Sequence, residues 1–502
     1  MEQWHVITLV FLGYLAITLG IGLAAGRRAT KSVTGYVAGD REFGLLVMYF
    51  VTGASVFSAF AFLGGPGWAY SRGAAGFYIL SYGVIGMAPW YFVGPKAAGL
   101  GRRFGYVTQT QLLVGRFPSR FLSALVATLT VAALLPYITL QMRGAGIVIE
   151  AVTDGHISLA VGAALAYGIV VLYVLTSGVA AVGWTNTFQG IFMLVIAWTL
   201  GIYLPYKLYG GVGAMFEEIM AARPELLTAP GLTAAGDPWS WGGYSSAILV
   251  SAVGLMMWPH LFMKAFTAKD DRTLRRTVVL FPTFQLFLIP VFLIGFAGVL
   301  FPNAPADPDS ILPFLILRTE LPALVVGLFC AGALSASMST GDALLHACGS
   351  VAVEDGIRPF VPGLTDYQQR FLMRLLIVAA GALAYFFAIT GAQSLVVLLL
   401  TAYGIIAQLL PPIIAAMYWR RATTAGAIAG LLAGSATAVF FYLYPDLAPL
   451  DLHEGILGIL VHLPVLVIVS LLTPAQASDH SEAFVGTGAD VGSDASGSAA
   501  HA

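Results

Sequence analysis

Residues 54–70 read ASVFSAFAFLGGPGWAY, an apolar stretch that contains Gly64, Gly65, Pro66 and Gly67 close together. A helix interrupted within hydrocarbon leaves backbone N–H and C=O groups unpaired, at a cost of several kcal/mol each, unless protein, water or an ion satisfies them. A break in this stretch is therefore expected to face a binding site and not lipid.

The rest of the chain has the composition of a membrane protein. Of its 502 residues, 58% are hydrophobic and 10% are charged, whereas a soluble domain carries about 25% charged residues. Apolar runs of about 20 residues, long enough to cross a bilayer, recur from end to end. The sequence therefore predicts an all-α membrane protein with about thirteen transmembrane helices, near residues 5–25, 44–67, 76–95, 121–140, 157–176, 186–206, 241–262, 277–301, 316–340, 371–390, 394–417, 424–443 and 455–473.

Charge and its distribution predict how the chain sits in the membrane. A formal net charge of -1 gives no indication of a nucleic-acid partner. The N-terminal apolar run lacks a basic leader and a small-residue cleavage site, so we expect a retained helix and not a signal peptide. Placing the N-terminus outside the cell puts most Lys and Arg residues on the cytoplasmic side. An odd number of spans then puts the C-terminus in the cytoplasm.

Interruptions occur at matching places in two blocks of five spans. The second span carries Gly53 and the GGPG run, and the seventh, within residues 245–263, carries Gly254 and the run WPH at 258–260. An odd-numbered block re-enters the membrane with the opposite orientation, so the two blocks would be inverted repeats. Paired interruptions in inverted repeats indicate a transporter's binding site near the middle of the membrane. The alternative is that these Gly and Pro residues only kink membrane helices.

This pattern divides the chain into five expected regions. They are an N-terminal helix and loop (1–43), a first repeat (44–206), a second repeat (241–417), two C-terminal helices (418–473) and a cytoplasmic tail (474–502). The tail has no Lys or Arg and few large apolar residues, so it is expected to be disordered.

Residues 329–355 place hydroxyl side chains in an otherwise apolar helix. Ser335, Ser337, Ser339 and Thr340 precede Asp342. Each hydroxyl could simply bond a carbonyl of the preceding turn. The neighbouring Ser339 and Thr340, however, could turn two neutral oxygens toward one point, and a broken helix nearby would add bare carbonyls. Neutral oxygens suit sodium better than a divalent ion, which would require carboxylates.

Three stretches in this order resemble the sodium/solute symporter family, over roughly residues 35–440. They are ASVFSAFAFLGGPGWAY, GVAAVGWTNTFQG (178–190) and ASMSTGDALL (336–345), with WPH before Lys264 as a further likeness. The resemblance implies a five-plus-five inverted repeat whose first helices are unwound. It also implies a sodium site that is formed by the backbone carbonyls of Ala54, Phe57 and Ala336 and the hydroxyls of Ser339 and Thr340.

Departures from that family and likenesses within it refine the expectation. Many members have acidic residues where this chain has Val56 and Asn186, so we expect one sodium ion per turnover. The stretches at 102–113, 134–149 and 62–73 look most like monocarboxylate permeases. The resemblance thus implies a sodium-coupled importer of a monocarboxylate anion in the plasma membrane, without a cofactor and not an enzyme. Pantothenate or proline symport is the alternative within the family.

Several residues are candidates for binding the solute: Ser58, Phe60, Tyr137, Arg143 and Trp258. A carboxylate could be received by the positive N-terminal ends of the interrupted half-helices. Arg143 could pair with it, since a charge inside the membrane is a functional candidate. The alternative is that Arg143 lies at the outer end of its helix and snorkels to the interface.

Functions of other classes find less support. A channel would need a filter of carbonyl or charge rings, and the sequence contains nothing like one. An enzyme would need a nucleophile with a base or a metal cluster, and His260 and His346 lie on different spans. Cys330 and Cys348 would lie about 27 Å apart on one helix, too far to pair. A proton-coupled transporter remains open, with Asp342 or Glu150 as the proton carrier.

Overall fold

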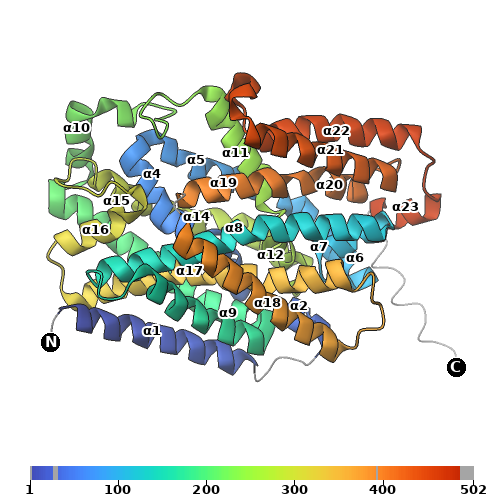
Figure 1. Cartoon of the computed structure of the whole chain (residues 1–502), viewed down its shortest axis with the longest axis horizontal. Coiled ribbons are helices and arrows are strands. Elements are labelled where there is room, and N and C mark those ends of the chain that lie inside the picture. Colours follow the sequence, from blue (N-terminus) through green and yellow to red (C-terminus); the bar gives the residue numbers. More distant parts are fainter. Residues whose placement is uncertain (1–2, 27–31, 392–393, 487–502) are drawn as a thin grey trace.

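The computed structural model describes residues 3–26, 32–391 and 394–486 and forms helices with no β-strand within them (Figure 1). Ten helices of this part are long and apolar enough to cross a membrane, and two bent helix pairs raise that number to as many as twelve. The unbent spans lie on α1 (Gln3–Gly26), α8 (Arg120–Val152), α9 (Leu159–Tyr209, two spans), α14 with α15 (Asp271–Gln285, Leu288–Ala297), α17 (Ala323–Val351), α18 (Asp366–Thr390), α19 with α20 (Leu395–Ile406, Leu410–Tyr418), α21 (Thr424–Leu443) and α22 (Glu454–Leu472). The span expected at 76–95 corresponds to α5 (Tyr78–Met87) and α6 (Trp90–Phe104).

The first bent pair consists of α3 (Leu45–Val56) and the helical segment Phe60–Met87, with a bend of 57° between them. This second segment begins with η2 (Phe60–Gly64) and α4 (Gly65–Arg72) and ends with α5. The helix is broken at residues 57–59, where Phe57 takes an extended conformation (φ −94°, ψ 90°). The GGPG run, expected to mark the break, instead lies in helical backbone one turn further on. The expected interruption is therefore present, but residues 57–59 form it, and none of them is Gly or Pro.

The GGPG run has two other roles. Pro66 has no N–H to donate to the preceding turn, and the turn before it, η2, is a wide π-helical turn. Gly64 and Gly67 allow other segments to approach closely. A Cβ on Gly64 would lie 2.9 Å from Val396, and one on Gly67 would lie 2.8 Å from the carbonyl oxygen of Pro308.

The second bent pair consists of α11 (Trp241–Leu255) and α12 with α13 (Pro259–Phe262, Lys264–Thr267), bent by 48°. Here the break falls at residues 256–258, as the WPH run predicted, and Pro259 occupies the first turn of α12, where its missing N–H costs nothing. Each predicted repeat begins with one bent pair. After the first pair come α6, α8 and the two halves of α9, and after the second come α14 with α15, α17, α18, and α19 with α20.

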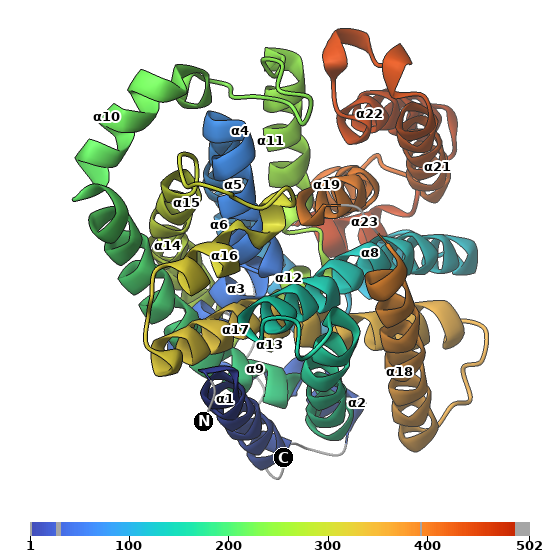
Figure 2. The same ribbon diagram turned by 60° about the vertical axis from the view of Figure 1, so that its left-hand side comes forward.

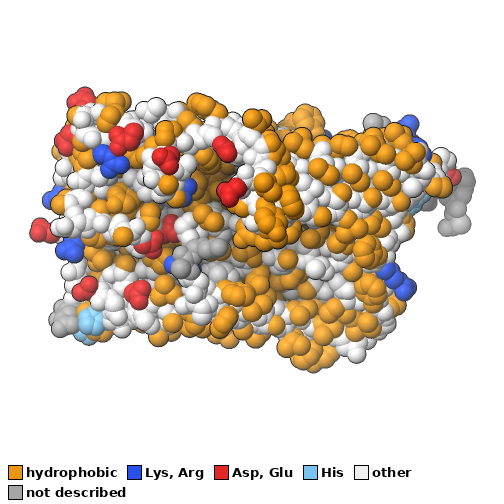
Figure 3. All heavy atoms as spheres, turned by 45° about the horizontal axis from the view of Figure 1, so that its top comes forward, with side chains coloured by type: hydrophobic (Ala, Val, Ile, Leu, Met, Phe, Trp, Pro, Cys, Tyr) orange, Lys and Arg blue, Asp and Glu red, His pale blue; other side chains and the backbone are white. Residues whose placement is uncertain are grey.

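The broken helices lie at the centre of the bundle. In Figure 2, α3, α12, α13 and α17 are central, whereas α1, α10 (Val212–Ala222), α18, α21 and α22 lie around them. The contacts agree with this arrangement, because α17 packs against α1, α8 and α9, and α3 packs against α9 and α14. Figure 3 shows a broad hydrophobic surface between two ends where the charged side chains gather.

Two predicted spans differ from the helices observed. The span expected at 316–340 is α17, which begins at Ala323 and runs on to Val351 and the wide turn η6 (Ala352–Ile357). The residues of α17 beyond position 340, Asp342 among them, are buried. Similarly, α8 continues to Val152 and not to residue 140. The remaining short helices are α2 (Val33–Ala38), α7 (Gln109–Arg116) and α16 (Ile311–Arg318).

The C-terminal tail differs from the prediction of disorder in part. Ser478–Val485 forms the helix α23, whose Phe484 is buried and whose Glu482 forms an ion pair with Arg420 at 2.8 Å. Lys96 also donates to the carbonyl oxygen of Val485 at 3.0 Å. The average composition of the tail did not indicate this short amphipathic helix. Residues 487–502 lie outside the described part of the chain.

Candidate functional site

The end of α3 presents backbone carbonyls to hydroxyl groups on α17. The Ala54 carbonyl oxygen accepts from Ser339 Oγ at 2.9 Å and from Thr340 Oγ1 at 3.3 Å. Thr340 Oγ1 also lies 3.3 Å from the Ser55 carbonyl oxygen, and Ser339 Oγ lies 3.3 Å from that of Ala336. All five residues are buried. Five uncharged oxygens from two helices thus meet in one place.

This cluster contains four of the five residues that the resemblance implied for sodium, and it adds the carbonyl of Ser55. The fifth, Phe57, ends α3, and its ring stacks on those of Phe281 and Phe284 with 5.7 Å between centroids. The hydroxyls of Ser339 and Thr340 reach carbonyls that precede Phe57. Because α3 ends at Val56, the carbonyls of its last turn lack partners within the helix and are open to these hydroxyls.

Acceptor oxygens continue along the interface of α9 and α17. Asn186 donates through Nδ2 to Ser55 Oγ at 3.1 Å and to the Ser339 carbonyl at 2.9 Å. Asp342 accepts through Oδ2 from Tyr173 at 2.9 Å and from Thr185 at 3.1 Å. The Oδ1 atoms of Asn186 and Asp342 are buried without a hydrogen-bond partner among the described residues. Both oxygens are therefore open to a donor or ion that these helices do not themselves supply.

Aromatic side chains surround the second break. Trp258 precedes α12, and its ring lies between those of Tyr137 on α8 and Tyr403 on α19, at 4.8 and 5.5 Å. His260 is buried, with its ring 5.8 Å from that of Tyr137. Two of the predicted solute residues, Tyr137 and Trp258, are therefore in contact at the second break.

The first break offers N–H groups on its far side. Ser58 Oγ accepts from the N–H of Phe60 at 3.2 Å, and Gln141 Oε1 on α8 accepts from the N–H of Ala59 at 3.0 Å. Ser58 and Phe60, both predicted solute residues, are buried at this break. Gln141 was not predicted. Its only signal in the sequence was a polar amide one turn after Tyr137 on an apolar helix.

Arg143 faces a different part of the bundle from Gln141, and its role in binding the solute stays a prediction. Successive helix residues are turned by about 100°, which places Arg143 on the side of α8 opposite to Gln141. It donates to the carbonyl of Gly391 at the end of α18. It also lines an apolar groove of about 240 Å³. The other residues that line this groove are Leu135, Pro136, Thr139, Phe387, Gly391 and Leu398.

Other titratable candidates have structural partners. His346 Nε2 donates to the carbonyl of Tyr36 at 2.9 Å, as expected for a core histidine. Glu150 Oε1 accepts from the N–H of Leu159 at 3.0 Å, at the start of α9. Cys330 and Cys348 are both buried and free on α17.

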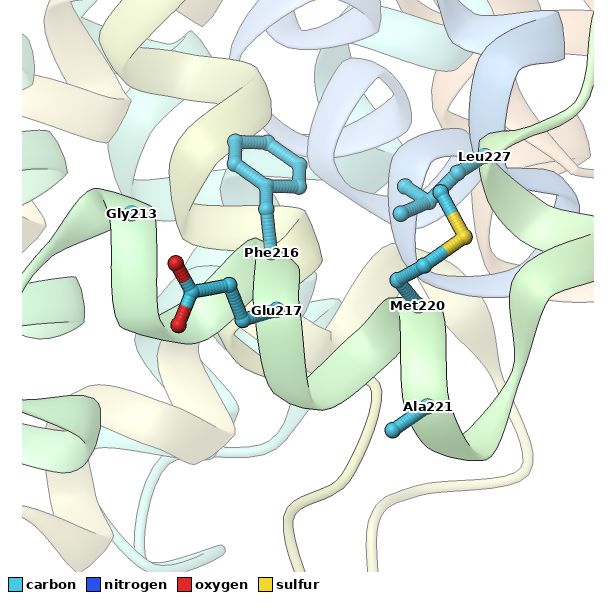
Figure 4. A pocket seen from close by; sticks show the side chains of 6 residues that line it. All are labelled: Gly213, Phe216, Glu217, Met220, Ala221 and Leu227. Atoms are coloured by element: carbon cyan, nitrogen blue, oxygen red, sulfur yellow. The ribbon is translucent and has the colours of Figure 1, made fainter.

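A separate hollow lies at the periphery, between α10 and the turn η4 (Pro224–Leu227). It has a volume of about 640 Å³ and is lined by Gly213, Phe216, Glu217, Met220, Ala221 and Leu227. Figure 4 shows Met220 next to Leu227, with Glu217 pointing away from both. Because α10 is peripheral in Figure 2, this hollow is distinct from the centre where the broken helices meet.

The bent helix pairs, the oxygen cluster and the aromatic groups correspond to one known family. The model of the sodium:solute symporter family matches residues 36–434. The chain belongs to this family. It is therefore a membrane transporter and not an enzyme.

Relatives of this transporter extend over nearly its whole length. An uncharacterised symporter, YhjB of Bacillus subtilis (strain 168), is 29% identical over 93% of this chain and 96% of the relative. A monocarboxylate transport permease protein of Rhizobium johnstonii is 24% identical, covering 93% and 97%. A sodium/pantothenate symporter of Escherichia coli (strain K12) is 27% identical, covering 89% and 91%.

The fold of this transporter is also found in a solved structure. A sodium-coupled sialic acid symporter in a substrate-bound outward-open state superimposes with a TM-score of 0.79, covering 94% of this chain and 99% of the other at 19% identity. This likeness shows the fold, with its two inverted repeats, as the sequence predicted.

Proposed function

We propose that this transporter imports a small organic anion, a monocarboxylate, together with sodium by alternating access. The observation that carries the proposal is the cluster of five uncharged oxygens where α17 meets the break of α3. The hydroxyls of Ser339 and Thr340 each carry lone pairs as well as a proton. By rotating, they can turn those lone pairs toward a sodium ion that the carbonyls of Ala54, Ser55 and Ala336 also contact.

The ion's identity and number follow from the charges nearby. None of the five oxygens belongs to a carboxylate, which favours a monovalent over a divalent ion. Val56 and Asn186 are uncharged at positions where many relatives of this kind are acidic, which supports one sodium ion per turnover. Asp342 is the nearest carboxylate on α17, and it is already hydrogen-bonded to Tyr173 and Thr185.

Sodium would couple the two inverted repeats. The carbonyls of Ala54 and Ser55 belong to the first repeat, and the hydroxyls of Ser339 and Thr340 belong to the second. An ion held between them would favour one relative position of the repeats, and the solute would bind best to that same position. Coupling then requires only that each ligand favour the state that the other needs.

The solute is expected between the two breaks, next to Ser58, Phe60, Tyr137 and Trp258. A monocarboxylate is supported by the likeness of three sequence stretches to monocarboxylate permeases. It is also supported by the extended match to a relative that bears that name. Pantothenate is the second candidate, because a sodium/pantothenate symporter matches at a similar identity. Both solutes carry a carboxylate.

We further propose that the protein lies in the plasma membrane, with its N-terminus outside the cell and its C-terminus in the cytoplasm. The start of α1 and the helix α23 lie at opposite ends of the bundle in Figure 1, which supports an odd number of crossings between them. The distribution of Lys and Arg along the sequence supports this orientation, because it places most of them on the cytoplasmic side.

Uptake into proteoliposomes tests the proposal. Labelled acetate, pyruvate, lactate, pantothenate and proline are each offered under an inward sodium gradient and under an equal potassium gradient. We expect uptake of a monocarboxylate with sodium alone. Uptake of proline or pantothenate instead would overturn the assigned solute, and equal uptake under both gradients would overturn the assigned ion.

A further inference from the structure

We infer that Gln141 binds an oxygen atom of the transported solute through its side-chain NH2 group, an inference that rests on the proposed function. Gln141 lies on α8, is fully buried, and reaches the first break through its hydrogen bond to Ala59. Its chemistry at that point identifies the kind of solute atom that fits.

The orientation of the Gln141 amide follows from its partner. The group that faces Gln141 at 3.0 Å is the N–H of Ala59, which can only donate. The atom of the amide that receives this hydrogen bond must therefore be the oxygen, Oε1. The nitrogen, Nε2, then carries two hydrogens, and it has no partner among the described residues.

A buried donor without an acceptor lowers stability, so such a group calls for a partner that the protein itself does not supply. The end of a broken helix can be capped by an acceptor alone, as Ser58 does for Phe60. Capping therefore explains the oxygen of Gln141 but not its nitrogen. The NH2 group is the part of the side chain that remains for a ligand.

The position of Gln141 places this donor between the two breaks. Tyr137, one turn earlier on the same face of α8, contacts Trp258 at the second break. Gly144, on the same face and about one turn later, approaches the first break so closely that a Cβ there would lie 2.6 Å from Ala59. The face of α8 that carries Gln141 thus spans the region expected to hold the solute.

The same residue is tied to the helix of the oxygen cluster. Ser337 Oγ on α17 donates to the backbone carbonyl of Gln141 at 2.7 Å, and Ser337 lies two residues before Ser339. Tyr167 in turn contacts the Ser337 hydroxyl at 3.1 Å. The position of Gln141 is therefore fixed by α17 as well as by the break.

An uncharged donor selects its ligand by type. The NH2 group donates to an oxygen that can accept, such as a carboxylate or keto oxygen, and not to an ammonium group, which only donates. Arg143, the nearest cationic residue on α8, faces the opposite side. Gln141 therefore assigns to the solute an acceptor oxygen, such as that of a carboxylate or ketone, that is recognised by neutral hydrogen bonding.

The variant Gln141→Glu separates the two roles of the residue. Its carboxylate keeps an acceptor for the N–H of Ala59 at the same length, but it replaces the donor with a second acceptor. For the solute that the wild type takes up with sodium, we expect KM to rise at least 30-fold. The sodium concentration for half-maximal uptake should change less than threefold.

Two further variants make the test decisive. Gln141→Met removes both the donor and the acceptor for the N–H of Ala59, without adding charge, so it should raise KM at least 10-fold. Gln109→Glu is the matched control, because Gln109 is also a buried glutamine whose amide atoms lack partners, but it lies on α7. It should lower the yield of folded protein and leave KM within threefold.

The outcomes distinguish this inference from the proposed function. Unchanged KM in Gln141→Met, or an equal rise in KM and in the half-maximal sodium concentration in both Gln141 variants, would overturn the role of the donor and leave sodium symport intact. If the wild type takes up none of the five solutes with sodium, the proposed function fails first. Sodium-driven uptake of a solute without an acceptor oxygen would overturn the assigned ligand class alone.

Discussion

Removing one hydroxyl from the oxygen cluster should weaken sodium binding by an amount that the structure allows us to bound. Ser339 Oγ is fully buried and lies 2.9 Å from the carbonyl oxygen of Ala54. An oxygen that contacts a charged partner contributes about 1.5–3 kcal/mol, and about 1.4 kcal/mol corresponds to a factor of ten in affinity. Ser339→Ala should therefore raise the Kd for sodium about 10- to 150-fold.

Two measurements follow this change. The first is the sodium dependence of solute uptake into proteoliposomes. The second is the melting temperature of the purified protein in sodium against potassium. A ligand at 100 times its Kd stabilises the folded state by about 2.7 kcal/mol, and a 20-fold weaker Kd reduces this to about 1.1 kcal/mol. Most of the sodium-dependent rise in melting temperature should therefore disappear in Ser339→Ala.

A neighbouring serine provides the control. Ser335 lies one turn earlier on α17 and is equally buried, but its hydroxyl contacts Ala331 and Tyr14 at 2.8 and 2.9 Å. Ser335→Ala should cost about 1 kcal/mol of stability and leave the sodium Kd unchanged. An unchanged sodium Kd in Ser339→Ala, or the same change in Ser335→Ala, would refute the assignment of the cluster to sodium.

Three further changes test other parts of the site. Asp342→Asn keeps an acceptor for Tyr173 and Thr185, so sodium-dependent uptake should stay within threefold of wild type; loss of uptake together with its pH dependence would favour proton coupling. Burial raises the pKa of Asp309 to about 6, above its ordinary value of 3.8. The folded state thus holds this proton more tightly than the unfolded state, and its stability should fall by about 1 kcal/mol as the pH rises from 5.5 to 7.5. Melting temperatures should fall less steeply with pH in Asp309→Asn than in wild type, and an identical slope in the two proteins would contradict the assignment. Gly67→Ala would bring a Cβ against a backbone carbonyl and should lower stability by about 1–3 kcal/mol. Gly65→Ala, whose nearest contact is an ordinary 3.4 Å, should not. Equal melting temperatures in the two variants would show that the backbone near Gly67 can move to accept the Cβ.

The sequence predicted that two helices break but not where the first one does. Gly64 to Gly67 indicate a break because Gly and Pro are the usual signals for one. The actual break at residues 57–59 depends on partners far away in the chain, above all Gln141 on α8 and the hydroxyls on α17. At the second break, the local signal was sufficient because Pro259 itself begins the new helix.

The residues of the candidate site were likewise predictable only in part. Ser339 and Thr340 could be found because adjacent hydroxyls are conspicuous in an apolar helix. Arg143 was conspicuous for its charge, but the span that carries it was expected to end at residue 140. Since α8 continues as a helix to Val152, the 100° turn per residue directs Arg143 away from Gln141 and toward α18. Tertiary packing, which a single sequence does not reveal, determines which neighbours each of the two residues faces.

The two sides of the first break explain how one interruption can serve a cation and an anion. Before the break, the carbonyl oxygens of Ala54 and Ser55 face the hydroxyls of α17. After it, the N–H of Ala59 faces Gln141. A peptide chain exposes acceptors where a helix ends and donors where the next begins, so the six residues 54–59 supply both kinds of group. Because α17 contacts the first side through Ser339 and is linked to the second through Ser337 and Gln141, sodium and solute should stabilise one arrangement of the break. Thermodynamic linkage then requires that saturating sodium lower the Kd of the solute by the same factor as saturating solute lowers the Kd of sodium. Titration calorimetry on the purified protein measures both factors, and a factor of one in either direction would separate the two sites.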